Sequence, residues 1–303
     1  MPNFTETAPL VEIPCPFGHP GPCREIVDTV WEADESKVYM CPECEIVFLH
    51  PIMSEAEEQA FYEAEFSKYM GARGEKIGAG PAEHFKNFEA EGQRRLRNLE
   101  RFLRPDMKVL ELGSSTGYLL DALRPHVAAV TGIEPEVANR QHAESIGIEM
   151  VGHLDDVRER KFDLILAYYV VEHLRDPVGY LGTLHAMLEP GGHFAMEVPN
   201  VDDALVRYYQ LDAFDRFYWQ KAHYFNYSHK TMSDVLKRAG FSETEMIPEQ
   251  RYDISNHIHW LWQGQPGGKG RYTDLLDDRV NAEYQRVLRD RWYCDTVFAV
   301  ATK

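Results

Sequence analysis

The sequence predicts an α/β protein built on a doubly wound, mostly parallel sheet. Two observations support this fold class. From residue 107 onward, short apolar runs alternate with helical stretches, which is the order expected when helices connect parallel strands. The first run leads into a glycine-containing turn and then a helix, an arrangement that brings a ligand to the carboxyl ends of the strands. A separate group of four cysteines within the first 44 residues indicates a small additional module.

Seven apolar runs are assigned to strands, namely residues 107–112, 127–133, 148–151, 162–169, 192–198, 244–249 and 295–302. Two segments interrupt the alternation. Residues 200–230 are rich in aromatic side chains, and residues 250–293 include a predicted helix at 274–292. The aromatic and histidine side chains of the second insert suit either an amphipathic substrate or the interface of a homodimer.

Length and charge narrow the class of function. A chain of 303 residues, 44% of them hydrophobic, suits one large domain, residues 105–303, with smaller parts before it. The formal net charge of −17 argues against a nucleic-acid partner, because such partners are bound through lysine and arginine. The sequence contains no long apolar run and no signal-peptide pattern at its start, so we expect a cytoplasmic protein that acts on a small molecule and binds no membrane.

Residues 54–104 are predicted to form a helical lid and linker. Ser54 and Glu57 make a capping box that opens a helix over residues 54–69, and a second helical pattern covers residues 83–103. The segment between them, residues 70–81, is rich in glycine and reads as a hinge. Tyr62 and Tyr69 stand close to this hinge and could belong to the lid.

The turn after the first strand is the predicted cofactor loop. Its spacing fits neither the dinucleotide fingerprint, because Ser115 and Tyr118 stand where glycines are needed, nor the phosphate loop. Glycine allows a backbone to approach a ligand closely and to present its N–H groups. The candidate cofactor-binding residues are Glu111, Gly113, Ser114, Ser115, Gly117 and Tyr118.

This loop resembles the E-x-G-x-G-x-G loop of class I S-adenosylmethionine (SAM)-dependent methyltransferases, with Ser115 in place of the middle glycine. The segments FDLI, EHLRDP, LEPGG and VPN follow in an order similar to that of many bacterial small-molecule methyltransferases. The resemblance implies a Rossmann-like, seven-stranded methyltransferase sheet with SAM as the cofactor.

The same resemblance implies roles along the SAM site. Glu134, followed by Pro135, would accept hydrogen bonds from the ribose hydroxyls, and Leu154 and Asp155 would line the adenine. Asp155 could instead cap a helix, with Asp156 taking its place. Tyr168 could lay its ring near the sulfonium.

The cysteine cluster predicts a structural zinc site in residues 1–53. Cys41 and Cys44 form a C-x-x-C knuckle, and Cys15 and Cys23, separated by seven residues, would complete four thiolate ligands. His19 is a rival to Cys23, and reduced cysteines without metal are a further alternative. Residues 41–51 resemble the N-terminal zinc module of some sugar C-methyltransferases, which implies a module that packs on the catalytic domain and helps to close the substrate cleft.

Histidines are the candidate general bases, because their pKa lies near neutrality. His173 follows the strand at 162–169, at the edge of the sheet where ligands bind. The segment around His223 and Tyr224 resembles the E-H-x-x-Y-F-S segment of sugar C-methyltransferases, whose histidine and neighbouring tyrosine act at the substrate. Ala222 stands where that family has glutamate. A structural role remains open for both histidines.

We therefore expect a SAM-dependent methyltransferase that methylates an oxygen of a sugar or a secondary metabolite, with a histidine base, in natural product or glycan biosynthesis. Two alternatives remain open. One is a relative of the sugar C-methyltransferases. The other is a non-catalytic SAM-binding protein whose zinc module recruits a partner.

Overall fold

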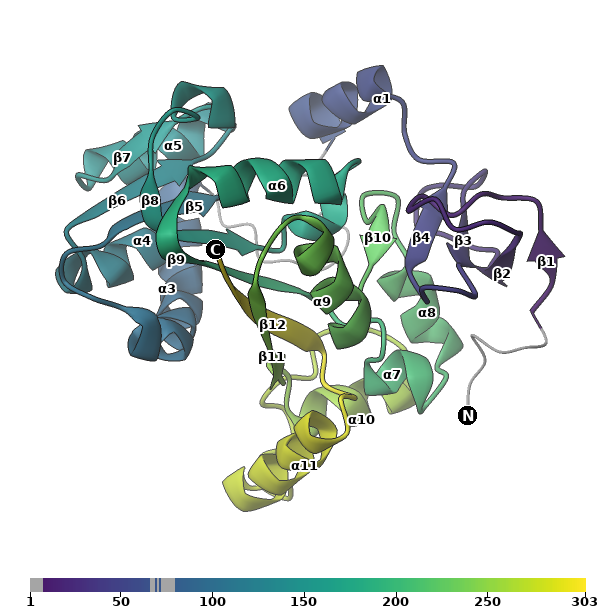
Figure 1. The fold of residues 1–303 in the computed structure, drawn as a ribbon. Helices are drawn as coiled ribbons and strands as arrows, with labels where there is room; N and C mark the ends of the chain where they lie inside the picture. Colours follow the sequence, from purple (N-terminus) through teal and green to yellow (C-terminus); the bar gives the residue numbers. More distant parts are fainter. Residues whose placement is uncertain (1–7, 66–68, 70, 72–79) are drawn as a thin grey trace.

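The computed structural model describes residues 8–65, 69, 71 and 80–303, which form two β-sheets with helices around them (Figure 1). The predicted hinge at 70–81 and the end of the predicted helix 54–69 lie largely outside the described residues. Among the described residues, no helix is both long enough and apolar enough to cross a bilayer.

The larger sheet contains the seven predicted strands, in the order β11-β12-β9-β8-β5-β6-β7. β12 runs antiparallel to both of its neighbours, and the other neighbouring pairs are parallel. Strand order reverses at β5, because the chain continues from β5 to β6 and β7 on one side and then returns to β8 on the other. The crevice at this reversal is where open α/β sheets bind ligands. The strands are β5 (Lys108–Leu112), β6 (Ala129–Ile133), β7 (Glu149–Val151), β8 (Phe162–Tyr168), β9 (Leu188–Pro199), β11 (Glu243–Glu249) and β12 (Thr296–Thr302).

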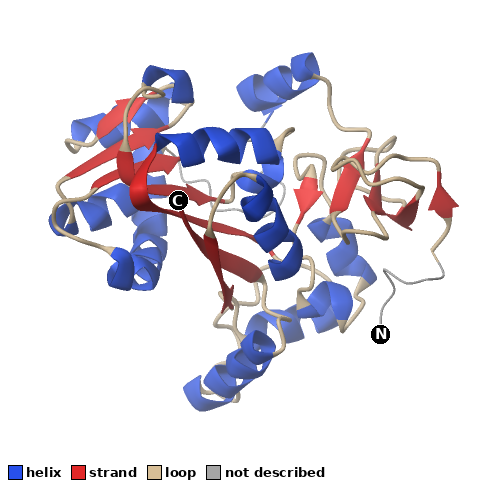
Figure 2. Ribbon diagram, in the orientation of Figure 1, coloured by secondary structure: helices blue, strands red, loops and turns tan. Residues whose placement is uncertain are grey.

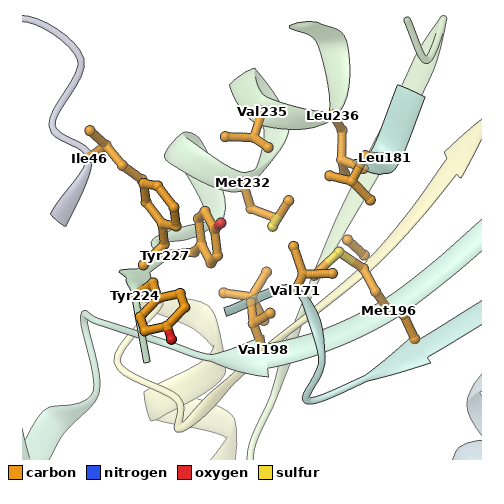
Figure 3. Packing of buried hydrophobic residues seen from close by; sticks show 14 of the residues in the cluster. Ile46, Val171, Leu181, Met196, Val198, Tyr224, Tyr227, Met232, Val235 and Leu236 are labelled. Carbon is orange, nitrogen blue, oxygen red and sulfur yellow. The ribbon is translucent and has the colours of Figure 1, made fainter. Parts of the chain in front are cut away.

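Helices cover both faces of this sheet (Figure 2). One face packs against α3 (Pro81–Leu99), α4 (Tyr118–Leu123) and α5 (Val137–Ser145), and the other against α6 (Pro177–Met187) and α9 (His229–Arg238). Side chains alternate along each strand, so each strand contributes to both apolar clusters. Figure 3 shows the cluster on the face covered by α6 and α9, which includes Leu181, Met196, Met232, Val235 and Leu236. Full burial of each such side chain contributes about 1.5–3 kcal/mol to the free energy of folding.

The smaller sheet joins the N-terminal residues to the first insert. Its strands are β1 (Leu10–Val11), β2 (Cys23–Val27), β3 (Lys37–Met40), β4 (Val47–His50) and β10 (Phe225–Asn226), in the order β1-β2-β3-β4-β10. β10 pairs antiparallel with β4, with Phe225 opposite Phe48. Leu49 also donates its backbone N–H to the carbonyl of Tyr224 at 2.9 Å. The N-terminal sheet is therefore completed by a strand that follows His223 directly.

The predicted lid helix begins where the capping box places it. Ser54 accepts a hydrogen bond from the Glu57 backbone, and the Glu57 carboxylate accepts one from the Ser54 backbone. The helix α1 covers Glu55–Ala60 and continues as a π-helical turn, η1, over Phe61–Glu65. The later predicted helix at 83–103 corresponds to α3 and the 3₁₀ turn η2 (Glu100–Phe102).

Both inserts are helical outside β10. The first contains α7 (Ala204–Arg207) and α8 (Asp212–Tyr218), and the second contains α10 (Ile254–Gln263) and α11 (Asp278–Asp290). The helix predicted at 274–292 is confirmed as α11, with shorter bounds. α10 was not predicted.

Candidate functional site

The glycine-containing loop lies between β5 and α4, as predicted. Gly113, Ser115 and Gly117 all have positive φ angles, of 63°, 49° and 82°. A Cβ atom at Gly117 would lie 2.7 Å from a methyl carbon of Ile148, so glycine is required there. Ser115 instead adopts the left-handed conformation that the family's glycine takes more readily. Ser114 is buried and donates its backbone N–H to the carbonyl of Ile133, which fixes the loop beside β6.

Glu134 lies at the carboxyl end of β6 and faces this loop. One carboxylate oxygen accepts the backbone N–H of Ser115 at 2.8 Å, and the other accepts that of Glu136 at 2.8 Å. Burial raises the pKa of Glu134, while these backbone N–H groups oppose the rise. The next residue, Pro135, is exposed. The carboxylate thus connects the ends of two adjacent strands, where the predicted ribose contact requires it.

A buried group of opposite charges flanks the loop on the β8 side. The Arg95 guanidinium from α3 lies 4.3 Å from the centre of the Tyr168 ring and donates to the Tyr118 hydroxyl at 2.8 Å. Glu111, at the end of β5, is only 2% exposed, and burial raises its pKa to about 8. Within the described structure, one Glu111 carboxylate oxygen and the Tyr168 hydroxyl have no hydrogen-bond partner. Buried polar atoms without partners are rare, so they indicate a place where a polar ligand binds.

The segment predicted to line the adenine forms the 3₁₀ turn η4 (Leu154–Asp156) after β7. Leu154 is half-buried and the Asp155 side chain is 83% exposed, paired with Arg158 at 3.3 Å. Asp156 accepts the backbone N–H of His153 at 3.0 Å. The capping contact therefore belongs to Asp156, and the Asp155 carboxylate is accessible to a ligand.

His173 and His223 meet beyond the end of β8. Glu172 and His173 belong to the 3₁₀ turn η5 (Val171–His173), and His223 precedes β10. The two imidazole ring centres are 5.0 Å apart and nearly perpendicular. His173 Nδ1 lies 2.7 Å from the carbonyl oxygen of Ala222, so Nδ1 donates and Nε2 carries the lone pair. Burial lowers the pKa of His173 to about 4 and raises that of Glu172 to about 8.

Tyr224 is 2% exposed and lies in the apolar cluster of Figure 3. The Arg175 guanidinium lies 5.4 Å from the centre of its ring and also forms an ion pair with Glu58 of α1. Burial and the nearby Glu58 raise the pKa of Tyr224 to about 12. The structure thus brings Tyr224 to the point where the lid helix joins the sheet, beside the two histidines.

The lid tyrosines reach the histidine pair. The Tyr62 hydroxyl lies 3.4 Å from His173 Nδ1. Tyr69 donates its hydroxyl to the Gln220 side-chain oxygen at 2.8 Å, and the Gln220 amide nitrogen lies 3.4 Å from His223 Nδ1. These contacts connect Tyr62 and Tyr69 to both candidate bases, and their role in a lid stays a prediction.

In the structure, the fourth residue of the cysteine cluster is His19, whereas the first prediction had Cys23. Ligand atoms of Cys15, His19, Cys41 and Cys44 all lie within 4.8 Å of one another. Cys15 Sγ is 3.8 Å from Cys44 Sγ and 3.4 Å from His19 Nδ1. Cys23, on β2, is fully buried, and burial together with the neighbouring Cys41 and Cys15 raises its pKa to about 12. The arrangement favours the alternative in which His19 replaces Cys23.

This donor set fits zinc. Three thiolates and one imidazole form a standard tetrahedral structural site. Burial raises the pKa of the Cys41 thiol, but the backbone N–H groups of Cys44 and Glu43 and the thiols of Cys15 and Cys44 lower it by more, so the net change is downward. Burial raises the pKa of Cys44 to about 12, so the fit to zinc rests on the kind and spacing of the four ligands.

Sequence reasoning missed three residues of the site. Glu172 stands in the quoted EHLRDP segment, yet nothing in the pattern shows that its carboxylate is buried. Arg95 lies in the predicted helix 83–103 and Gln220 in the aromatic insert, and neither belongs to a motif. A signal was available for Glu172 alone, because an acidic residue next to a candidate base is a natural partner for it.

Comparisons with known proteins agree with the fold. A family model described as a methyltransferase domain matches residues 85–245, which is more than half of the chain. The ubiquinone biosynthesis O-methyltransferase of Nitrobacter winogradskyi is 38% identical over 103 residues, which cover 31% of this chain and 39% of that protein. The chain thus spans about two fifths of the length of this curated relative.

Two further proteins are similar. The tRNA U34 carboxymethyltransferase of Desulforapulum autotrophicum is 30% identical over 156 residues, which cover 46% of each chain. Among solved structures, a SAM-dependent methyltransferase from Archaeoglobus fulgidus matches with a TM-score of 0.50 and 16% identity, over 73% of this chain and 97% of that one. At that identity the match supports the fold alone.

Proposed function

Because this chain belongs to the methyltransferase domain family and carries a SAM-dependent methyltransferase domain, we propose that it transfers the methyl group of SAM to a hydroxyl oxygen of a sugar or a secondary metabolite. One observation carries the proposal. His173 and His223 meet 5.0 Å apart beyond β8, at the same edge of the sheet as the cofactor loop. An imidazole at this edge is suited to take a proton from an acceptor hydroxyl.

The loop and its surroundings support SAM as the cofactor. SAM supplies a methyl group already activated by its sulfonium, so the protein mainly binds and orients the two reactants. Glu134 would accept hydrogen bonds from the ribose hydroxyls, and the backbone N–H groups near Ser115 would face the methionine part. Arg95 offers a positive charge for the carboxylate of that part, and Glu111, whose pKa burial raises to about 8, offers an acceptor oxygen for its ammonium.

The remaining predicted contacts are also compatible with SAM. Leu154 and Asp155 lie after β7, next to β6, where the adenine of a cofactor held by Glu134 would extend. The Tyr168 ring ends β8 and already has a guanidinium against it, so it can lie against a second cation such as the sulfonium.

On the acceptor side, the protein itself offers two proton acceptors. His173 Nε2 carries a lone pair, because Nδ1 donates to Ala222. His223 lies beside Gln220, whose side chain Tyr69 in turn holds. Closure of the lid over this pair would exclude water from the methyl transfer, which protects the activated methyl group from hydrolysis.

A small molecule is the favoured acceptor class. The net charge of −17 opposes a polynucleotide, although one relative is named for tRNA. Oxygen is the favoured atom because another relative is named an O-methyltransferase and because Ala222 replaces the glutamate of the sugar C-methyltransferase segment. We also propose a cytoplasmic site of action.

Zinc is proposed as a structural metal in the N-terminal module, held by Cys15, His19, Cys41 and Cys44. The module shares its sheet with β10, which follows His223 and Tyr224. Zinc would thus help to hold the acceptor side of the cleft in place without taking part in the reaction.

Labelled methyl transfer tests the function. The protein is incubated with methyl-labelled SAM and a panel of sugar, phenol and tRNA acceptors, and the products are analysed by mass spectrometry. We expect an O-methyl ether of a small molecule and S-adenosylhomocysteine. His223→Gln and His173→Gln should lower kcat by about 10²–10⁴-fold without changing SAM affinity.

Three results contradict the proposal. If the labelled methyl group is found on a carbon atom or on tRNA, the acceptor is a different one. If SAM binds and no methyl group is transferred, the protein is non-catalytic. Full activity in both histidine variants removes the proposed base.

A further inference from the structure

Glu172, His173 and His223 form a compact cluster at the acceptor side of the site. Each offers one nitrogen or oxygen atom, and these atoms all lie within 4.8 Å of one another. The cluster joins two segments distant in the sequence, because η5 follows β8 whereas His223 belongs to the first insert.

Glu172 has no function in the scheme so far. Its side chain is 1% exposed, and neither carboxylate oxygen has a hydrogen-bond partner within the described structure. A buried carboxylate without hydrogen bonds is unfavourable, even with the charge of Arg251 acting on it. The fold retains this group next to two imidazoles, so a positively charged partner would explain its presence.

The spacing of the cluster distinguishes a metal site from a hydrogen-bonded pair. A carboxylate that orients a histidine accepts a hydrogen bond from its ring, and Glu172 accepts none within the described structure. Around an ion with metal–ligand bonds of about 2.0–2.2 Å, neighbouring ligand atoms lie about 3–4 Å apart without bonding to each other. A Glu172 carboxylate that lies within 4.8 Å of both imidazoles and accepts no hydrogen bond within the described structure is compatible with the second arrangement.

The surroundings also resemble those of metal-binding histidines. Such histidines usually donate their other ring nitrogen to a carbonyl or carboxylate, which fixes the ring and the free lone pair. His173 Nδ1 makes this contact with the Ala222 carbonyl at 2.7 Å. The Gln220 amide nitrogen, held in place by Tyr69, lies 3.4 Å from His223 Nδ1 and can only donate, so the pattern belongs to His173 and not to His223.

We propose that Glu172, His173 and His223 bind a divalent first-row transition metal ion, and that its open coordination positions take two adjacent oxygen atoms of the acceptor. The two-histidine, one-carboxylate set is known for such ions and leaves open positions for other ligands. This inference rests on the proposed O-methyltransferase function and narrows the acceptor to molecules with neighbouring hydroxyls, such as vicinal diols or catechols.

Compared with the scheme that uses a histidine base, only the removal of the proton differs. A histidine whose lone pair binds the ion can no longer accept a proton. The ion instead lowers the pKa of the hydroxyl that it binds, and that hydroxyl releases its proton to water. The resulting oxyanion forms the O–C bond to the methyl carbon as the C–S bond breaks, and that electron pair stays on sulfur. The products are the methyl ether and neutral S-adenosylhomocysteine, with one proton released.

Manganese is the most direct probe. Mn²⁺ prefers oxygen and nitrogen ligands, whereas the cysteine cluster prefers zinc, so the two sites can be measured separately. The zinc-containing protein is titrated with MnCl₂, and free Mn²⁺ is followed by electron paramagnetic resonance. We expect one site per chain, and addition of catechol should change the spectrum of the bound ion.

Two variants and a control locate the ion. Glu172→Gln keeps the shape of the side chain and removes its charge, and His223→Gln removes one nitrogen ligand. Each should raise the Kd for Mn²⁺ at least about tenfold, and unchanged zinc content and thermal melting confirm that each is folded. His185→Gln, on α6 outside the cluster, should bind Mn²⁺ like the unmodified protein.

The outcomes separate this inference from the proposed function. Failure to bind Mn²⁺, or equal binding by both cluster variants, overturns the metal site. Full transferase activity in protein that retains zinc but holds no other metal also overturns it, and leaves O-methylation with a histidine base intact. Metal binding without any O-methylation would instead remove the proposed function.

Discussion

Replacement of Glu134 by glutamine is expected to weaken SAM binding by roughly tenfold to a hundredfold. In the structure, the Glu134 carboxylate accepts two backbone N–H groups at 2.8 Å, from the loop after β5 and from the turn after β6. Glutamine retains one carbonyl oxygen but presents an amide N–H₂ to the other donor. One charge-assisted hydrogen bond is therefore lost where the loop must face the cofactor.

The magnitude follows from the kind of bond that is lost. A hydrogen bond to a charged group contributes about 1.5–3 kcal/mol, and about 1.4 kcal/mol corresponds to a tenfold change in Kd. Calorimetric titration with SAM measures the change directly. Thermal melting without SAM shows how much of the loss comes from the loop itself.

Glu136→Gln is the matched control. Glu136 contributes its backbone N–H to Glu134, which glutamine preserves, and its own side chain is exposed. Its Kd should stay within about twofold, since exposed substitutions of this kind are usually within ±0.5 kcal/mol. A Kd for Glu134→Gln within that same range would refute the assignment of Glu134 to the cofactor site.

Three further predictions concern the metal module and stability. Cys23→Ser should keep about one zinc per chain whereas His19→Ala should lose it, as measured by metal analysis; the reverse result would make Cys23 the ligand. Arg94→Met should lower the free energy of unfolding by about 1.5–3 kcal/mol, because the fully buried Glu197 on β9 loses its ion pair at 2.7 Å and keeps only the one with Arg95 at 3.7 Å. Arg101→Met, which breaks an exposed ion pair, should lower the free energy of unfolding by less than about 1 kcal/mol. Urea denaturation measures both variants, and equal losses for Arg94→Met and Arg101→Met would contradict the argument. Burial lowers the pKa of His257 from 6.5 to about 4, so the unfolded chain binds more protons and stability is lost as pH falls from 6.5 to 4. His257→Gln should remove up to about 3 kcal/mol of this loss in the free energy of unfolding. If the free energy of unfolding falls equally with pH in the variant and in the unmodified protein, His257 is not the group responsible.

The large sheet was predictable because its strands are buried on both faces. Such strands read as continuous apolar runs, and the seven predicted runs correspond to the seven strands observed. The N-terminal strands were not predicted. They are two to five residues long and lie among cysteines, glycines and prolines, so they lack a period long enough to detect. Their pairing also depends on β10, which is remote in the sequence.

The site was predictable where a motif fixes the backbone. It was less predictable where tertiary packing determines which side chains meet. The loop around Gly113 and Gly117 follows from strand, turn and helix in succession. The choice between Cys23 and His19 depends on how residues 15–22 fold before β2 begins at Cys23, which spacing does not reveal. The burial of the Glu172 carboxylate depends on segments that come from other parts of the chain, so only the folded structure shows it.

The pairing of β4 with β10 has a consequence for how the chain matures. Residues 47–50 need residues 225–226 as their neighbour, so the N-terminal module cannot complete its sheet until residues 225–226 have emerged from the ribosome. Until then β4 has no partner on its outer side, and the sheet beside the cysteine cluster is incomplete. Zinc supplied early in expression should therefore improve the yield of folded protein more than zinc added after purification.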